Sequence, residues 1–286
     1  MSILSEFLHN YAPSNGWGTF FTAAFGAFAG AFAASRAHNK RTIVAELNAL
    51  SAARELSVAI ANILLALKRQ HVVPLNDNFE RIRVSYANHQ SMLKAGTQLA
   101  PFHFTADLRS LDLPATPQVA LEKMIFEKTL IRGRALAALV ALVGAIDGLS
   151  LSTKARNEMV ENRRTAKWSD QERLEFFLGL RTAAGVIDER FPTNIIAITE
   201  QTDFCIFFAK TLTADVAQYA NRLRWREGWF YRLRVPRIDE ADWSYPEKMG
   251  LMPKEDDYRN WLRGFQPRPT RWQRFLASFA SKKEPK

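Results

Sequence analysis

Residues 16–34 have the sequence GWGTFFTAAFGAFAGAFAA, which contains no charged side chain and no proline. As an α-helix these 19 residues would be about 28 Å long, because the rise is about 1.5 Å per residue. That length is close to the hydrocarbon thickness of a bilayer, about 30 Å. The rest of the chain is polar enough for water. We therefore interpret residues 16–34 as a single membrane-spanning helix that carries a large helical domain.

Small residues recur at every fourth position of this segment: Gly18, Thr22, Gly26, Gly30 and Ala34. Residues four apart lie on one side of a helix, so these form a ridge, and most of the phenylalanines fall on a different face. The GxxxG pair within the ridge lets two helix backbones approach closely in a membrane. The ridge predicts a homo-oligomer formed through the membrane helix, although glycine-rich composition alone also produces such a pattern.

Two other interpretations of residues 16–34 stay open. A secretory signal peptide ends in a small-x-small motif, which residues 31–33 resemble, but residues 1–15 contain no Lys or Arg. A buried, glycine-rich core helix of a soluble protein is the second alternative. Both would remove the membrane anchor from the mature domain.

The flanking charges predict an orientation. Arg36, Lys40 and Arg41 directly follow the apolar segment. By the positive-inside rule, the N-terminus lies outside and the main domain is cytoplasmic, which we interpret as a bacterial inner-membrane location. The single cysteine, Cys205, suits a reducing compartment and excludes an internal disulfide framework.

The composition predicts a mainly α protein in four parts. We expect a short lead over residues 1–15, the anchor over 16–35, a helical bundle over 36–265, and a basic amphipathic tail over 266–286. The formal net charge is +10, and residues 222–286 hold 16 Lys and Arg against 9 Asp and Glu. The basic surface is therefore concentrated toward the C-terminal end of the chain.

Apolar periodicity and breaker residues predict the helices of the bundle. A first helix over residues 40–71 has no breaker between it and the anchor, and we expect Pro74 to end it. A more polar helix over 75–95 would then run antiparallel to it. Residues 99–113 are expected to cross the bundle as an irregular or extended segment. The further helices expected are 116–146, 151–164, one opened by a capping box at Ser169, 192–226, and a short one after Pro253.

The expected helix over 116–146 contains an apolar stretch, residues 135–146. Twelve residues are too few to cross a bilayer, so we interpret them as the central buried helix. A second membrane span is the alternative.

A basic-aromatic cluster occupies residues 222–237. Arginine with exposed aromatic rings suits an anionic membrane surface, where the rings lie at headgroup depth. The same residues suit single-stranded nucleic acid, and they also suit a structural role with the rings in the core and the arginines paired to acids. The residues we single out for contact are Arg222, Arg224, Trp225, Arg226, Trp229, Arg232 and Arg234.

The C-terminal tail has a comparable pattern. Thr270 can cap a final helix whose apolar side chains face one way and whose basic side chains face the other. This pattern is typical of a helix lying in the headgroup region, and packing on the bundle is the alternative. The tail residues expected to contact the membrane are Arg271, Trp272, Arg274, Phe275, Lys282 and Lys283.

The sequence contains no phosphate-binding loop, dinucleotide fingerprint, zinc-protease motif, CxxC pair or nucleophile elbow, and its histidines lack metal-ligand spacing. We therefore assign no catalytic residue, cofactor or metal. Asp147 and Asp203 are candidate buried carboxylates, and Cys205 is expected to be an inert core thiol. The sequence favours an interaction, scaffolding or signalling role at the cytoplasmic face of a membrane. A membrane-tethered nucleic-acid binder and an enzyme without a recognisable motif are the alternatives.

Overall fold

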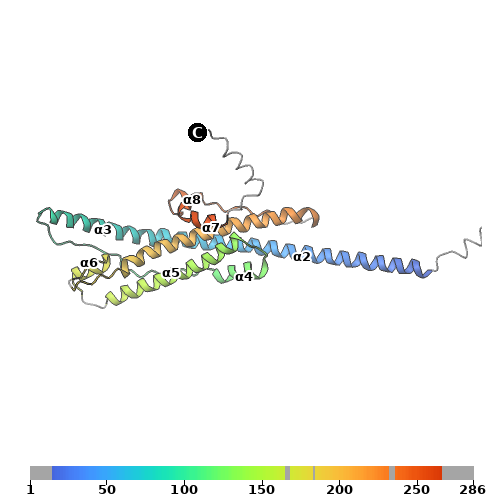
Figure 1. Ribbon diagram of the computed structural model, residues 1–286, viewed down its shortest axis with the longest axis horizontal. Helices are drawn as coiled ribbons and strands as arrows, with labels where there is room; N and C mark the ends of the chain where they lie inside the picture. Colours follow the sequence, from blue (N-terminus) through green and yellow to red (C-terminus); the bar gives the residue numbers. More distant parts are fainter. Residues whose placement is uncertain (1–14, 165–167, 183, 232–235, 266–286) are drawn as a thin grey trace, which may run out of the picture.

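A single rod of helix runs through most of the protein (Figure 1). The computed structural model describes residues 15–164, 168–182, 184–231 and 236–265. Helix α2 (Asn15–Leu67) passes into the π-helix η1 (Lys68–Val72), which leads into α3 (Val73–Lys94). At 1.5 Å per residue the rod is about 120 Å long. The unbroken passage from residue 35 to residue 71 follows from the lack of proline and glycine there.

Pro74 does not end the rod, contrary to the expectation of a stop and an antiparallel second helix. Proline removes one backbone hydrogen bond and clashes with the carbonyl four residues earlier. The π-turn accommodates this, because the Val73 N–H donates to the Lys68 carbonyl, five residues back. Pro74 then lies in the first turn of α3, where proline is tolerated. Figure 1 shows α3 continuing the direction of α2.

Two long helices pack against the rod: α5 (Arg134–Arg164) and α7 (Arg190–Tyr231). Glu46 of α2 pairs with Tyr219 of α7, and Lys68 of η1 pairs with Asp203 of α7. The earlier residue of the rod therefore contacts the later residue of α7, which means that α7 runs antiparallel to α2. The main core lies where the three helices meet and includes Leu50, Ile60, Leu64, Leu139, Leu142, Ile206, Leu212 and Val216.

The expected helix over residues 116–146 is two helices. Helix α4 (Gln118–Lys128) ends before a turn, and α5 begins after it. Within the turn the Leu130 N–H donates to the Glu46 carboxylate at 2.9 Å, and Gly133 has a left-handed backbone with φ of +69°. A partner on α2 therefore stabilises the break. The expected boundary before residue 151 is also wrong, because α5 continues to Arg164.

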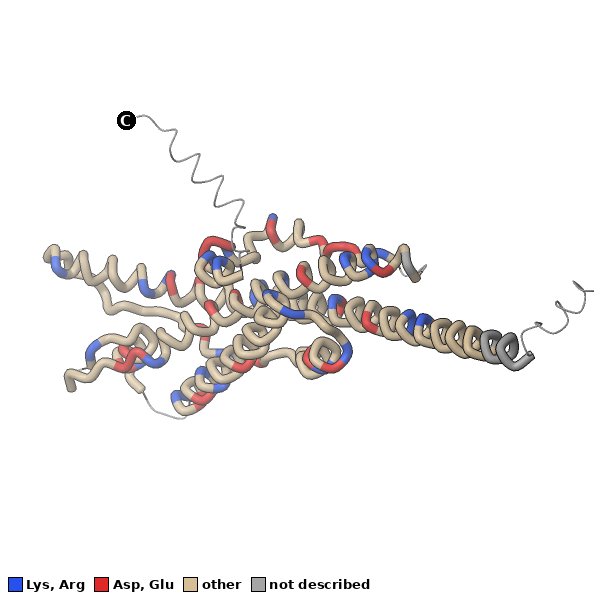
Figure 2. Tube along the Cα trace, turned by 45° about the vertical axis from the view of Figure 1, so that its right-hand side comes forward, with Lys and Arg blue, Asp and Glu red and all other residues tan. Residues whose placement is uncertain are grey.

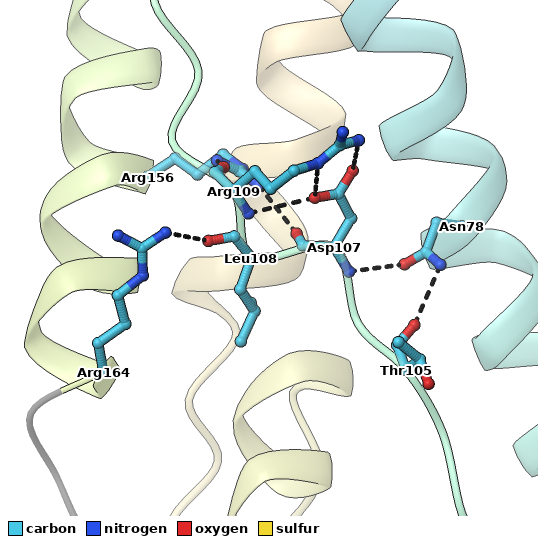
Figure 3. A network of polar contacts seen from close by, with 7 residues as sticks. All are labelled: Asn78, Thr105, Asp107, Leu108, Arg109, Arg156 and Arg164. Carbon is cyan, nitrogen blue, oxygen red and sulfur yellow. Dashed lines mark hydrogen bonds and ion pairs between the residues drawn. The ribbon is translucent and has the colours of Figure 1, made fainter.

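Residues 97–117 form the irregular crossing segment that the sequence predicts. Side chains of neighbouring helices hold its backbone (Figure 3). The Asn78 amide accepts from the Asp107 N–H at 3.0 Å and donates to the Thr105 carbonyl at 3.2 Å. Arg156, which is buried, donates to the carbonyls of Arg109 and Asp107 at 2.6 and 3.0 Å. These bonds replace the backbone partners that a helix or strand would supply.

A second, smaller core lies near the far end of the rod, away from the N-terminus. Helix α6 (Asp170–Leu178) begins with the predicted capping box, in which Ser169 and Glu172 bond each other's backbone N–H. Phe79 of α3, Phe177 of α6 and Phe191 of α7 meet in this core. It fixes α6 and the crossing segment against the ends of α3 and α7.

The last described segment, residues 236–265, folds back onto the middle of the rod. It comprises α8 (Ser244–Lys248), the 3₁₀-helix η2 (Glu255–Tyr258) and α9 (Arg259–Arg263). Lys68 donates to the Leu251 carbonyl at 2.8 Å, and the Tyr258 ring stacks on Phe207 with centroids 3.7 Å apart. The protein is therefore mainly helical, with 76% helix and no strand among the described residues.

Candidate functional site

The N-terminal part of α2 projects beyond the rest of the molecule. Residues 23–42 are all exposed, and packing against the bundle begins at Ile43. Phe25, Phe28 and Phe32 are between 58% and 74% exposed. Figure 2 shows this projecting length free of charged residues up to the basic positions nearer the bundle. A contiguous apolar surface of this kind marks an interaction site with a membrane or with another protein.

Two helical stretches of the described chain are long and apolar enough to cross a membrane, residues Ala23–Lys94 and α5. The most apolar window of the first is 44% buried, so it lies largely in the packed part of α2 and not in residues 23–42. The window in α5 is 33% buried. Both windows therefore also line the core. Residues 16–34, which precede the first window, have the length of a membrane anchor or signal sequence.

The small-residue ridge lies on the projecting part of α2. Gly26, Gly30 and Ala34 are exposed, and a Cβ added at either glycine would meet no described atom within 4 Å. Gly18 and Thr22 belong to the same helix, but their side chains lie outside the described part. A second helix therefore has unobstructed access to Gly26 and Gly30.

Two tryptophans stand out at the C-terminal end of α7. Trp225 is 84% exposed and Trp229 is 90% exposed, and the pair lies one helical turn apart on one face. The helix was expected to end near Arg226, but it passes through Gly228 and continues to Tyr231. The structural interpretation of these rings as core residues is therefore wrong. Full exposure of two indole rings is unusual for a soluble surface.

This end of α7 points toward the N-terminal end of α2 (Figures 1 and 2). The Tyr219 hydroxyl contacts Glu46 Oε1 at 3.1 Å, which aligns the two helices. From that contact, Trp225 and Trp229 lie about 9 and 15 Å farther along α7. From Glu46 toward the N-terminus of α2, the same two distances reach Lys40 and Arg36. The tryptophans therefore lie at the level of the basic residues that follow the apolar segment.

Basic side chains accompany Trp225. Arg222 and Arg237 line with it an open hollow of about 460 Å³, whose wall also includes Glu240. Arg226 pairs with its neighbour Glu227 at 2.7 Å, and this pair lies on the surface. Arg224 also belongs to this part of α7, and its side chain is half-buried. The surface formed by Arg222, Trp225, Trp229 and Arg237 is called the α7 end surface below.

Other predicted contact residues lie outside the described residues. Arg232 and Arg234 fall in the gap at 232–235. The tail residues Arg271, Trp272, Arg274, Phe275, Lys282 and Lys283 all lie beyond residue 265, the last one described. The predictions for the tail therefore stay predictions.

The three candidate reactive groups, Cys205, Asp203 and Asp147, differ in burial and in partners. Cys205 is fully buried, which confirms its predicted core position, and burial raises the pKa of its thiol to about 12. That the thiol is inert stays a prediction. Asp203 forms a salt bridge with Lys68 at 2.5 Å, and Asp147 is exposed. No group of three or more His, Cys, Asp or Glu suited to a metal ion occurs within the described ranges.

Sequence reasoning did not single out Lys68 or Arg156, which both hold long-range contacts. Lys68 continues the apolar stripe of Ile60 and Leu64 at four-residue steps, and Arg156 lies between the buried Leu149 and Val160. A charged residue on an apolar stripe indicates a buried charge that has hydrogen-bond or ion-pair partners.

Comparison of the chain with protein-family models, curated proteins and solved structures finds no match.

Proposed function

We propose that this protein is a single-pass, membrane-anchored helical protein with an interaction, scaffolding or signalling role at the cytoplasmic membrane face. The observation that carries this proposal is the alignment of two exposed apolar features at one end of the molecule. They are the projecting part of α2 and the α7 end surface. In this arrangement the anchor spans the bilayer, and the two tryptophans reach its headgroup region.

The energetics favour lipid as the partner of both features. Burying one large apolar side chain stabilises by about 1.5–3 kcal/mol, and the projecting part of α2 exposes three phenylalanines. Tryptophan favours the membrane–water interface, where its ring is partly buried and its N–H stays hydrated. Each arginine near an anionic surface adds about 1 kcal/mol. We therefore expect the α7 end surface to contact anionic lipid, with the basic residues Arg36, Lys40 and Arg41 facing the same headgroups.

The anchor is tested on the full-length chain by membrane fractionation and protease protection. We expect the protein to stay in the membrane pellet after a high-salt wash and to leave it only with detergent. Protease added from the cytoplasmic side should digest the bundle. Recovery of the intact chain in the supernatant, or loss of its first thirty or so residues on export, contradicts the proposal.

The lipid contact is tested by a polarity-sensitive label. Gly228→Cys places a thiol between the two tryptophans, where an added Cβ meets no described atom within 4 Å. Met92→Cys, at an exposed position near the other end of the rod, is the matched control. The full chain is labelled with nitrobenzoxadiazole and reconstituted in vesicles of phosphatidylcholine and phosphatidylglycerol.

We expect a blue shift at position 228, with quenching by headgroup nitroxide lipids, and neither effect at position 92. Equal exposure of the two labels to water contradicts the lipid contact. Binding of single-stranded DNA or RNA at position 228, steeply weakened by salt, would favour the nucleic-acid alternative instead.

Self-association through the anchor stays a prediction. Gly26→Leu with Gly30→Leu removes the close approach of two backbones, and the open surroundings of both glycines leave the single chain undisturbed. Energy transfer between labelled full-length chains in vesicles measures the effect, and Ala24→Leu, an exposed position on the opposite side of the helix, is the control. If the double variant associates as strongly as the control, the ridge is not the interface.

A further inference from the structure

A cavity of about 390 Å³ lies at the end of the molecule opposite the projecting part of α2. The crossing segment forms one wall, and the C-terminal end of α5 and helix α6 form the others. Its size falls within the range of small-molecule sites, about 300–1,000 Å³. Neither the anchor nor the α7 end surface contributes to it, so it is independent of the proposed membrane contact.

Aromatic rings form most of the apolar wall of this cavity. Phe102 and Phe104 of the crossing segment stack with centroids 6.3 Å apart and planes 17° apart. Across from them, the Trp168 ring meets Phe176 edge to face at 5.6 Å, and Phe177 lies 5.9 Å from Phe104. Trp168 and both crossing-segment phenylalanines are only half-buried. Part of each of these three rings is therefore accessible, and all three line the cavity.

Arginines supply the charge of the cavity. The Arg163 guanidinium lies 3.6 Å from the Trp168 ring centroid and 4.4 Å from that of Phe176. Its ion pair with Asp188 is long, at 3.9 Å, and burial lowers the pKa of the guanidinium. Arg164 and Arg173 also line the cavity, whereas Asp170 is the one acidic residue among its lining residues. The lining is therefore net positive, and Arg163 is already oriented by the rings.

The crossing segment is fixed before any ligand arrives (Figure 3). Arg164 donates to the Leu108 carbonyl at 3.1 Å, and Asn78 bonds the backbone at Thr105 and Asp107. These contacts hold the backbone directly after Phe104 and at Leu108. A preformed pocket lowers the ordering penalty of binding.

We propose that this cavity binds a planar aromatic anion, with its ring among Phe102, Phe104 and Trp168 and its carboxylate, sulfonate or phosphate on Arg163. Aromatic rings prefer stacked or edge-to-face neighbours, which these walls provide. A flexible acyl chain gains no such geometry and loses rotamer freedom on binding. Arginine binds planar oxyanions through paired N–H groups, and Arg173 at the rim adds a second cation.

The test is calorimetric titration of the detergent-solubilised full chain with 2-naphthoate. Cyclohexanecarboxylate, which lacks the aromatic ring, and 2-naphthamide, which lacks the charge, are the control compounds. We expect saturable one-to-one binding of naphthoate, and binding at least about tenfold weaker for each control compound. Absence of saturable naphthoate binding at millimolar concentration overturns the proposal, as does equal binding of either control compound.

Variants locate the binding site. Arg163→Gln and Phe104→Leu should each weaken naphthoate binding about tenfold or more. Arg173→Gln is added because this exposed side chain makes only a long surface pair with Asp170, so its loss spares the fold. Arg259→Gln, an exposed arginine on α9, is the control and should leave binding unchanged. Equal binding by the three cavity variants and the control overturns the assignment. The anchor and lipid-contact experiments measure different properties from these titrations. The proposed membrane function and the proposed anion site can therefore be contradicted independently.

Discussion

The Tyr219 hydroxyl donates a hydrogen bond to Glu46 Oε1 at 3.1 Å, and the same oxygen accepts the Leu130 N–H at 2.9 Å. Glu46 therefore joins α2, the turn before α5, and α7 at the place where the rod leaves the bundle. Burial, followed by the negative charge of Glu46, raises the pKa of the Tyr219 hydroxyl, which keeps it a donor at neutral pH.

Glu46→Ala should destabilise the protein more than Tyr219→Phe does. The first change removes the acceptor of two donors, the Leu130 N–H and the Tyr219 hydroxyl, so it loses two part-buried hydrogen bonds worth about 0.5–1.5 kcal/mol each. The second removes one hydrogen bond, worth about 0.5–1.5 kcal/mol. Denaturant unfolding of the full chain in detergent, followed by circular dichroism, measures both. Equal effects of the two variants would show that Glu46 has no role at the turn.

The salt bridge between Lys68 and Asp203 should show strong coupling in a double-mutant cycle. Lys68 is nearly buried and also donates to the Leu251 carbonyl, so Asp203→Leu alone leaves a buried ammonium and should cost about 3–5 kcal/mol. Lys68→Met with Asp203→Leu should recover part of that loss, because no charge is left unpaired. The same unfolding assay applies. Additive effects of the two single changes would argue that the pair is solvated and uncoupled.

Acid should weaken the Asp107–Arg109 ion pair within the crossing segment. The Arg109 side chain, which hydrogen-bonds Asp107, holds the pKa of that carboxyl below its usual value of 3.8. Because the folded-state pKa is the lower one, this stabilisation is fully present above about pH 3.8 and is lost as pH falls through the depressed pKa. The stability difference between the natural chain and Asp107→Asn should therefore shrink from pH 6 to pH 3. A difference that stays constant would place Asp107 outside this linkage.

Cys205 should resist thiol reagents in the folded protein. Burial raises its pKa to about 12, so the thiolate is scarce at pH 8, and the side chain is also inaccessible. We expect no maleimide labelling in detergent by intact-mass spectrometry, and complete labelling in guanidinium. Met92→Cys is the positive control for an exposed thiol. Rapid labelling of the folded natural chain would show that α7 opens around Cys205.

Local features of the fold follow from the sequence. The Ser169–Glu172 capping box depends on residues three positions apart, and the continuity of α2 depends on the lack of breakers. Both features depend on residues that are close together in the sequence, so short-range patterns predict them. The irregular crossing segment and the burial of Cys205 were predicted on the same basis. The anchor, its orientation and the membrane contact of the tail stay predictions.

Other features needed the tertiary structure. A π-turn carries the rod past Pro74, whereas a local rule predicts a stop. The break before α5 depends on Glu46, which is 84 positions from Leu130, and the aromatic cavity draws on three separate segments. The sequence pattern within one segment does not predict which distant residue will contact it. The sequence alone therefore determined which stretches are helical and which are apolar, because those properties arise from neighbouring residues. Only packing decided where the helices break and which charges are paired. Packing also placed Trp225 and Trp229 at the same end as the apolar segment. These features depend on contacts between distant parts of the chain.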